Sequence, residues 1–81
     1  MRRPEYDVLL QVLQAAREER GLSARALSTA IGEGPMYINK IETKARRIDV
    51  VEFAALAQAL ETTPVALLEC WLAKLAENGN V

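Results

Sequence analysis

Apolar residues recur at intervals of three and four along most of the chain, which is the period of helices that bury one face. Val, Ile and aromatic residues never alternate with polar residues over a run long enough for a strand. Ala and Leu are abundant, whereas there are only four Gly and three Pro. The pattern therefore predicts an all-α fold, a compact bundle of five short helices with brief connections.

Helix boundaries can be predicted from capping residues. Gly21 is expected to end a first helix over about 5–20, and Ser23 to cap a second helix over about 24–31. Gly32 should end the second helix, and Gly34 should allow an unusual backbone. Pro35 is then predicted to open the third helix in its first turn.

The basic loop 44–47 follows the third helix. Asp49 with Glu52 three residues later predicts a capping box at the start of the fourth helix. Thr63 followed by Pro64 predicts the start of a fifth helix over about 64–77. The positions expected to face the core have helical spacing and are Leu9, Val12, Leu13, Ala16, Leu27, Ile31, Ile38, Ile41, Phe53, Leu56, Ala57 and Leu60.

Length and composition limit the possible functions. Eighty-one residues of which 51% are apolar are enough for one small domain. With one cysteine and no histidine, an internal disulfide, a metal site and a conventional catalytic triad are not expected. Cys70 is predicted to be a small buried side chain in a reducing compartment. There is also no glycine-rich phosphate loop, so we expect neither an enzyme nor a cofactor.

No apolar run approaches the length of a membrane span, and no signal-peptide pattern is present, so a cytoplasmic location is expected. The net charge of −1 is unevenly distributed. Residues 1–47 hold nine Lys/Arg and six Asp/Glu, a net +3, while residues 48–81 hold one Lys and five Asp/Glu, a net −4. A basic half can bind phosphate locally, because salt screens charges beyond roughly 10 Å.

Several spaced motifs then carry a family resemblance. They are REERGLS at 17–23, Leu27, Ser28 and Gly32, YINKIE at 37–42, RR at 46–47 and LAQAL at 56–60. Together they resemble the lambda-repressor-like, Cro/repressor type of helix-turn-helix. The match covers about Leu9 to Leu68, and RRIDVVEF at 46–53 looks like a variant common among bacterial and phage members. We therefore expect residues 1–81 to form a single helix-turn-helix domain, with 69–81 as the end of the fifth helix and a tail.

Small residues four apart support this interpretation independently. Ala24, Ser28 and Gly32 share one face of the second helix, where a crossing helix must approach closely. Family members commonly have Ala where this chain has Ser28. Arg17 and Glu42 match family positions that form an ion pair between the first and third helices, although two solvated surface charges are the alternative interpretation.

The resemblance also implies which residues contact double-stranded DNA. The N-terminal half of the third helix would enter the major groove. Its expected base-reading residues are Pro35, Met36, Asn39 and Lys40. The expected phosphate contacts are Ser23, Arg25, Tyr37, Thr43, Lys44, Arg46 and Arg47. For Tyr37 the alternative is packing beside Ile38 and Ile41, and for the basic loop it is a solvated charge cluster.

The fifth helix has more apolar surface than one face of a small bundle can bury. The resemblance turns Leu67 toward the core. This leaves Leu68, Trp71, Leu72 and Leu75 as a candidate homodimer face, with the alternative that Trp71 simply covers the core of a monomer. A two-fold dimer would suit a palindromic operator.

The sequence thus predicts a sequence-specific transcriptional regulator, most simply a repressor, with no small-molecule ligand. A phage-type repressor, a restriction-modification controller and an antitoxin-like autorepressor all fit. The alternative is a protein-interaction module on the same fold with weakened DNA contacts, which Pro35, Ala24 and the pI of about 5.4 favour.

Overall fold

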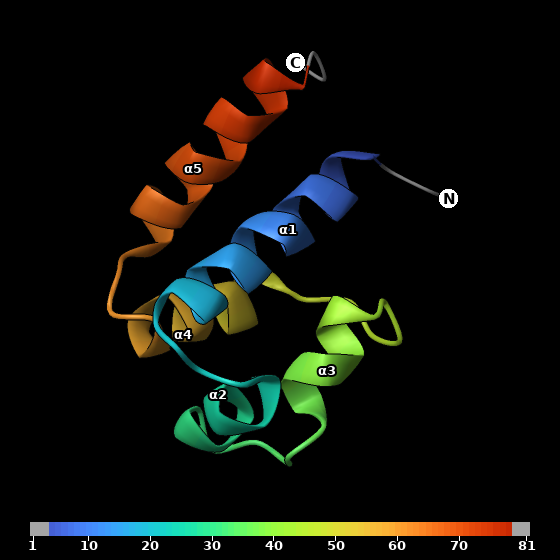
Figure 1. The fold of residues 1–81 in the computed structure, drawn as a ribbon, viewed down its shortest axis with the longest axis vertical. Helices are drawn as coiled ribbons and strands as arrows, with labels where there is room; N and C mark the ends of the chain where they lie inside the picture. The colour runs from blue at the N-terminus through green and yellow to red at the C-terminus, as the bar shows by residue number, and fades with distance from the viewer. Residues whose placement is uncertain (1–3, 79–81) are drawn as a thin grey trace.

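Five helices follow one another in the computed structural model, which describes residues 4–78. They are α1 (Pro4–Glu19), α2 (Ala24–Ala30), α3 (Tyr37–Glu42), α4 (Val50–Ala59) and α5 (Pro64–Glu77). No strand occurs in this range, so the predicted all-α fold is confirmed. α1 and α5 lie side by side, and α2 and α3 pack against each other below α1 in the view of Figure 1. The end of the predicted tail, 79–81, lies outside the described residues.

Most predicted helix ends are confirmed because local capping determines them. Gly21 and Gly32 have left-handed φ angles of 70° and 78°. The side chain of Ser23 accepts a hydrogen bond from the Ala26 N–H, and that of Thr63 accepts one from Ala66. Both halves of the Asp49–Glu52 capping box are formed.

A cluster of buried apolar side chains forms the hydrophobic core. The predicted inner residues of α2, α3 and α4 either belong to this cluster or pack against it. The prediction for α1 was incomplete. Val8 and Leu10 are buried beside the predicted Leu13, whereas Leu9 and Val12 are only half-buried. The reason is that α1 contacts both α5 and α3, so more than one stripe of the helix is covered.

The predicted start of the third helix at Pro35 was wrong. Pro35 and Met36 form a turn, and α3 begins at Tyr37. The expected unusual backbone at Gly34 is also absent, since its φ angle is not positive. The preference of proline for the first position of a helix reflects local backbone geometry alone. Here a contact from α2 determines where α3 begins.

That contact is the hydroxyl group of Ser28, which is fully buried. Its oxygen accepts a hydrogen bond from the Ile38 N–H at 2.9 Å, and the hydroxyl donates to the Ala24 carbonyl at 2.8 Å. The first N–H groups of a helix have no partner within the helix. Met36, at the N-cap of α3, offers no side-chain acceptor, so Ser28 supplies the cap from the neighbouring helix.

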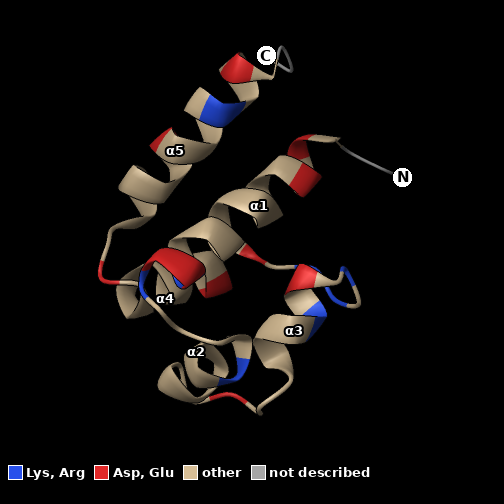
Figure 2. Ribbon diagram, viewed as in Figure 1, with Lys and Arg blue, Asp and Glu red and all other residues tan. Residues whose placement is uncertain are grey.

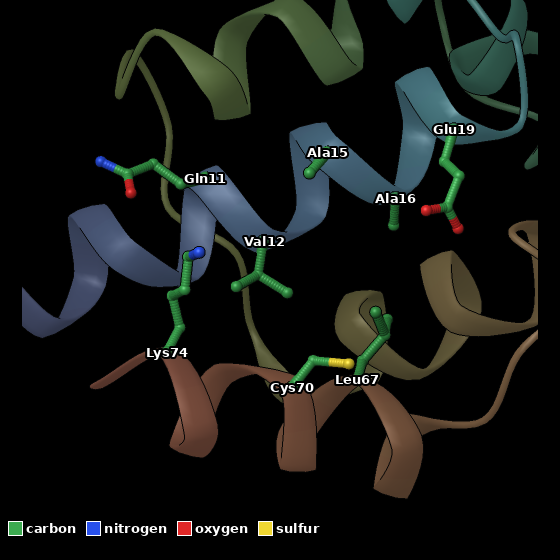
Figure 3. A pocket seen from close by; sticks show the side chains of 8 residues that line it. All are labelled: Gln11, Val12, Ala15, Ala16, Glu19, Leu67, Cys70 and Lys74. Carbon is green, nitrogen blue, oxygen red and sulfur yellow. The ribbon is translucent and has the colours of Figure 1, made fainter. Parts of the chain in front are cut away.

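Cys70 is exposed rather than buried, contrary to the sequence-based prediction. It lies at a groove of about 420 Å³ between α1 and α5, beside Val12, Ala16 and Leu67 (Figure 3). The small side chain of Ala16 leaves the groove open, so Cys70 is not covered.

Within residues 4–78, no single helix has both the length and the apolar composition of a membrane span. Only α4 and α5 taken together meet those criteria, and they are bent by 103° at their connection.

We predict that Ser28→Ala lowers the free energy of unfolding by about 1–3 kcal/mol, because the buried Ile38 N–H loses its acceptor. Chemical denaturation measures this change. The matched control is Thr29→Ala, which removes an exposed hydroxyl bonded to the Arg25 carbonyl and should change stability by less than about 0.5 kcal/mol. Equal losses in the two variants would contradict the capping role.

Candidate nucleic-acid interface

α3 presents a polar outer face because Ile38 and Ile41 are anchored in the core at 2% exposure each. Asn39 and Lys40 therefore point outward and are exposed. The exposed Thr43 follows at the C-cap, where its hydroxyl donates to the Asn39 carbonyl at 2.9 Å. Of the predicted base-reading residues, Asn39 and Lys40 are thus on the helix.

The other two predicted base-reading residues, Pro35 and Met36, lie in the turn before α3. Both are exposed, and 54% of Met36 is accessible. They line a hollow that also includes Tyr37, Lys40 and Arg46. An apolar wall beside two cations can accommodate a base edge next to its phosphate.

An ion pair fixes the far end of α3 to α1. Arg17 donates from Nε to Glu42 Oε2 at 2.7 Å and from Nη2 to Oε1 at 3.1 Å. Its Nη1 also donates to the Leu22 carbonyl at 2.7 Å. The hydrogen bond to Glu42 raises the pKa of Arg17 further above its ordinary value. The structure thus brings together the two residues that were expected to pair, and both are largely buried.

The basic loop turns sharply directly after α3. Lys44 has a left-handed φ angle of 68°, which is uncommon for a residue with a side chain. Its N–H donates to the Ile41 carbonyl, and the Arg46 N–H donates to the Lys40 carbonyl at 3.1 Å. This turn places the basic loop beside the C-terminal end of α3 (Figure 2).

Each cation of this loop contacts a different partner. Lys44 Nζ lies 2.6 Å from Asp7 Oδ1 on α1. The Arg47 guanidinium carbon lies 4.3 Å from the centre of the Tyr6 ring, within cation–π range. The Tyr6 hydroxyl oxygen also accepts a hydrogen bond from the Ile48 N–H at 3.3 Å. The loop is therefore attached to the first turns of α1.

Arg46 has two partners. Its Nη1 lies 2.6 Å from Glu52 Oε2, and its guanidinium carbon is 4.9 Å from the centre of the Tyr37 ring. Burial, together with a hydrogen bond to Glu52, raises the pKa of Tyr37 to about 12. The Asp49 N–H, followed by Tyr37 and Arg46, lowers the pKa of Glu52 to about 2. At neutral pH Tyr37 is therefore protonated and Glu52 ionised.

α2 packs directly against α3. Ser23 and Arg25 are exposed at the start of α2, and among the described residues Arg25 has no ion-pair partner. The same is true of Lys40 on α3 within residues 4–78. These two side chains can meet an anion without first breaking an ion pair.

The candidate dimer face on α5 needs one correction. Leu75 is buried at 5% exposure and belongs to the interior. Leu68 and Leu72 are 43% and 48% exposed. Trp71 is half-buried and donates from Nε1 to the Glu5 carbonyl at 2.9 Å. Leu75 turns inward because α5 packs against α1 over a long part of its length.

Comparison with known proteins identifies the family. A family model described as helix-turn-helix matches residues 13–67. The chain belongs to the Cro/C1-type helix-turn-helix family. This is a family of DNA-binding transcription regulators rather than of enzymes. No curated protein matches the chain.

Two solved structures are similar to this helix-turn-helix chain. One is an XRE-family like protein from Pseudomonas syringae pv. tomato str. DC3000, with 32% identity, a TM-score of 0.79, and coverage of 88% of this chain and 89% of that one. The other is the clp gene regulator ClgR from C. glutamicum. Its TM-score is 0.76 over 91% of this chain and 96% of that one, and its 19% identity supports the fold alone.

Sequence reasoning missed three residues of this helix-turn-helix surface. Asp7 and Tyr6 were not assigned to the basic loop, and Glu52 was assigned only to its capping box. Their contacts join residues up to 42 positions apart in the sequence, as between Tyr6 and Ile48. No local pattern could have indicated the contacts of Tyr6 and Asp7, whereas Arg46 and Glu52 are only six positions apart.

We predict that Arg17→Ala destabilises this helix-turn-helix domain by about 3 kcal/mol, because Glu42 and the Leu22 carbonyl lose their shared partner in a largely buried site. DNA affinity measured on the folded fraction should also fall, since α3 loses its attachment to α1. The matched control is Arg20→Ala, which breaks the exposed pair with Glu61 and should cost less than about 1 kcal/mol. Unchanged melting temperature and affinity in Arg17→Ala would contradict the role of the pair.

Proposed function

We propose that the chain is a sequence-specific transcriptional repressor that binds a palindromic operator as a homodimer. The observation that carries this proposal is the outward position of Asn39 and Lys40 on a helix held at both ends. Ser28 caps the first turn of that helix, and Arg17 pairs with Glu42 in its last turn. In a protein that occupies an operator, repression follows most directly from exclusion of the transcription machinery.

Asn39 and Lys40 are the proposed main readers of base edges. An amide side chain can bond adenine through two atoms, and an ammonium group can bond the acceptors of guanine. Met36 is proposed to contact a thymine methyl group from the turn. Pro35 has no side-chain donor, so it contributes shape only, and part of the specificity is expected to come from DNA deformability.

Phosphate binding is assigned to residues that border this face. Ser23 and Arg25 lie at the start of α2, Thr43 ends α3, and Lys44, Arg46 and Arg47 follow it. Tyr37 is proposed to act through Arg46, because the Arg46 guanidinium group lies over its ring. Cations placed on both sides of a reading helix set its register on the duplex.

The second copy is proposed to bind through α5. Leu68 and Leu72 are exposed on neighbouring turns, and Val65 continues this apolar stripe at 65% exposure. A hollow lined by Leu9, Phe53, Leu68 and Trp71 extends the surface to α4, where Val50 and Val51 are 80% and 75% exposed. A contiguous apolar surface of this kind favours burial against another copy.

A protein-interaction module is the competing function, and one observation favours it. Lys44 and Arg46 already pair with carboxylates of this chain, so their charge is partly neutralised before any DNA arrives. A mobility-shift assay at two salt concentrations separates the two functions. Binding that weakens steeply with salt indicates phosphate contacts.

We predict that selection from a random DNA pool enriches a palindrome whose half-sites lie about one helical turn apart, roughly 34 Å. Asn39→Ala should lose discrimination by about 1–3 kcal/mol at one base pair of each half-site. Sequencing of the bound pool measures both results. If no sequence is enriched and binding is insensitive to salt, the DNA-reading function is wrong.

We predict that Leu68→Glu converts a dimer into a monomer, because it places a charge in the proposed apolar interface. Analytical ultracentrifugation at micromolar concentration, with and without operator DNA, measures the change. Ala73→Glu is the matched control, since it adds the same charge to an exposed position about five residues along α5. A wild-type chain that stays monomeric even on operator DNA would contradict the dimer.

A further inference from the structure

One carboxylate joins three parts of the proposed DNA-binding surface. Glu52 Oε1 accepts the Asp49 N–H at 2.9 Å, which closes the cap of α4. Its Oε2 accepts Arg46 Nη1 at 2.6 Å, and the Arg46 guanidinium group in turn lies over the Tyr37 ring of α3. α3, the basic loop and the start of α4 therefore meet at one side chain that is only 19% exposed.

We propose that Glu52 is a positioning residue for DNA binding, whose carboxylate holds Arg46 against Tyr37 in the orientation that meets a backbone phosphate. The proposal rests on the proposed function, since it assigns a role within DNA binding. It assigns Glu52 no contact with DNA.

The geometry leaves Arg46 available to a phosphate while it is held. A guanidinium group has five N–H donors in a plane, and Glu52 occupies one edge through Nη1. The Tyr37 ring packs against the guanidinium group, which restricts the side chain. The Arg46 side chain remains 38% exposed. A cation fixed in this way loses less conformational entropy when the phosphate binds.

The pair of Lys44 with Asp7 has the opposite character. Both side chains are more exposed, at 49% and 33%, and within residues 4–78 no aromatic ring stacks on the ammonium group. Lysine is a compact point charge that contacts one anion as readily as another. Asp7 therefore competes with a phosphate for Lys44, whereas Glu52 prepares Arg46 for one.

The two pairs therefore predict opposite changes in DNA affinity when their carboxylates are neutralised. Glu52→Gln and Asp7→Asn each remove one negative charge near the same surface. If charge alone mattered, both variants would bind DNA more tightly. Glutamine also serves in the capping box, so Glu52→Gln retains the start of α4 while it loses the ionic hold on Arg46.

The test measures the affinity of the full chain for a mixed-sequence DNA duplex over a series of salt concentrations. Glu52→Gln should bind about 3- to 10-fold more weakly than wild type, the entropic cost of ordering one long side chain on binding. The slope of log affinity against log salt should flatten by up to about 0.9, the value for one phosphate contact. Asp7→Asn should bind more tightly, with a slope no flatter than that of wild type.

A double-mutant cycle ties the effect to Arg46. Arg46→Lys keeps the charge but loses the planar fork, and it should weaken binding as Glu52→Gln does. The double variant should be no weaker than Arg46→Lys alone, because Glu52 acts through that guanidinium group. Additive losses would overturn this role, and so would a Glu52→Gln variant that binds as tightly as Asp7→Asn. A wild-type chain without salt-dependent binding would overturn the proposed function as well.

Discussion

The orientation of α3 depends on two polar contacts that cross between helices. α3 has only six residues, too few to be stable as an isolated helix. Ser28 satisfies its first turn from α2, and Arg17 holds its last turn from α1. Between these contacts Ile38 and Ile41 enter the core. The outward direction of Asn39 and Lys40 follows from these anchors rather than from the short helix itself.

The cations near α3 are also held by contacts within the chain. The whole chain carries a net charge of −1, yet cations gather in the loop that follows α3 (Figure 2). Carboxylates at Asp7 and Glu52 and the rings of Tyr6 and Tyr37 hold three of those cations close to the fold. Intramolecular partners restrain flexible side chains, and they also lower the charge available to a distant anion. The cationic side chains of this surface are thus oriented, while its positive charge is only moderate.

The sequence predicted those features that local chemistry controls. The ends at Gly21, Asp49 and Thr63 follow from capping rules, and the pair Ile38 and Ile41 follows from helical spacing. The start of α3 was misjudged because a proline rule is local, whereas the Ser28 contact spans ten positions. Leu75 was placed outside because α5 is apolar on several sides, so periodicity alone does not select the buried one.

The sequence predicted some residues of the candidate site and not others. Spacing and resemblance indicated Asn39, Lys40 and the basic loop. The left-handed backbone of Lys44 had no signal, since neither glycine nor asparagine stands there. The role of Asp7 depends on which helices become neighbours, and that information appears only when the chain is folded.

We propose that the outer face of α3 and its adjoining loop form the DNA-reading surface. The most direct measurement is an NMR titration of the isotope-labelled chain with the selected duplex. We expect the largest amide shifts over residues 36–47 and at the start of α2. Shifts confined to the groove between α1 and α5, with α3 unaffected, would contradict this proposal.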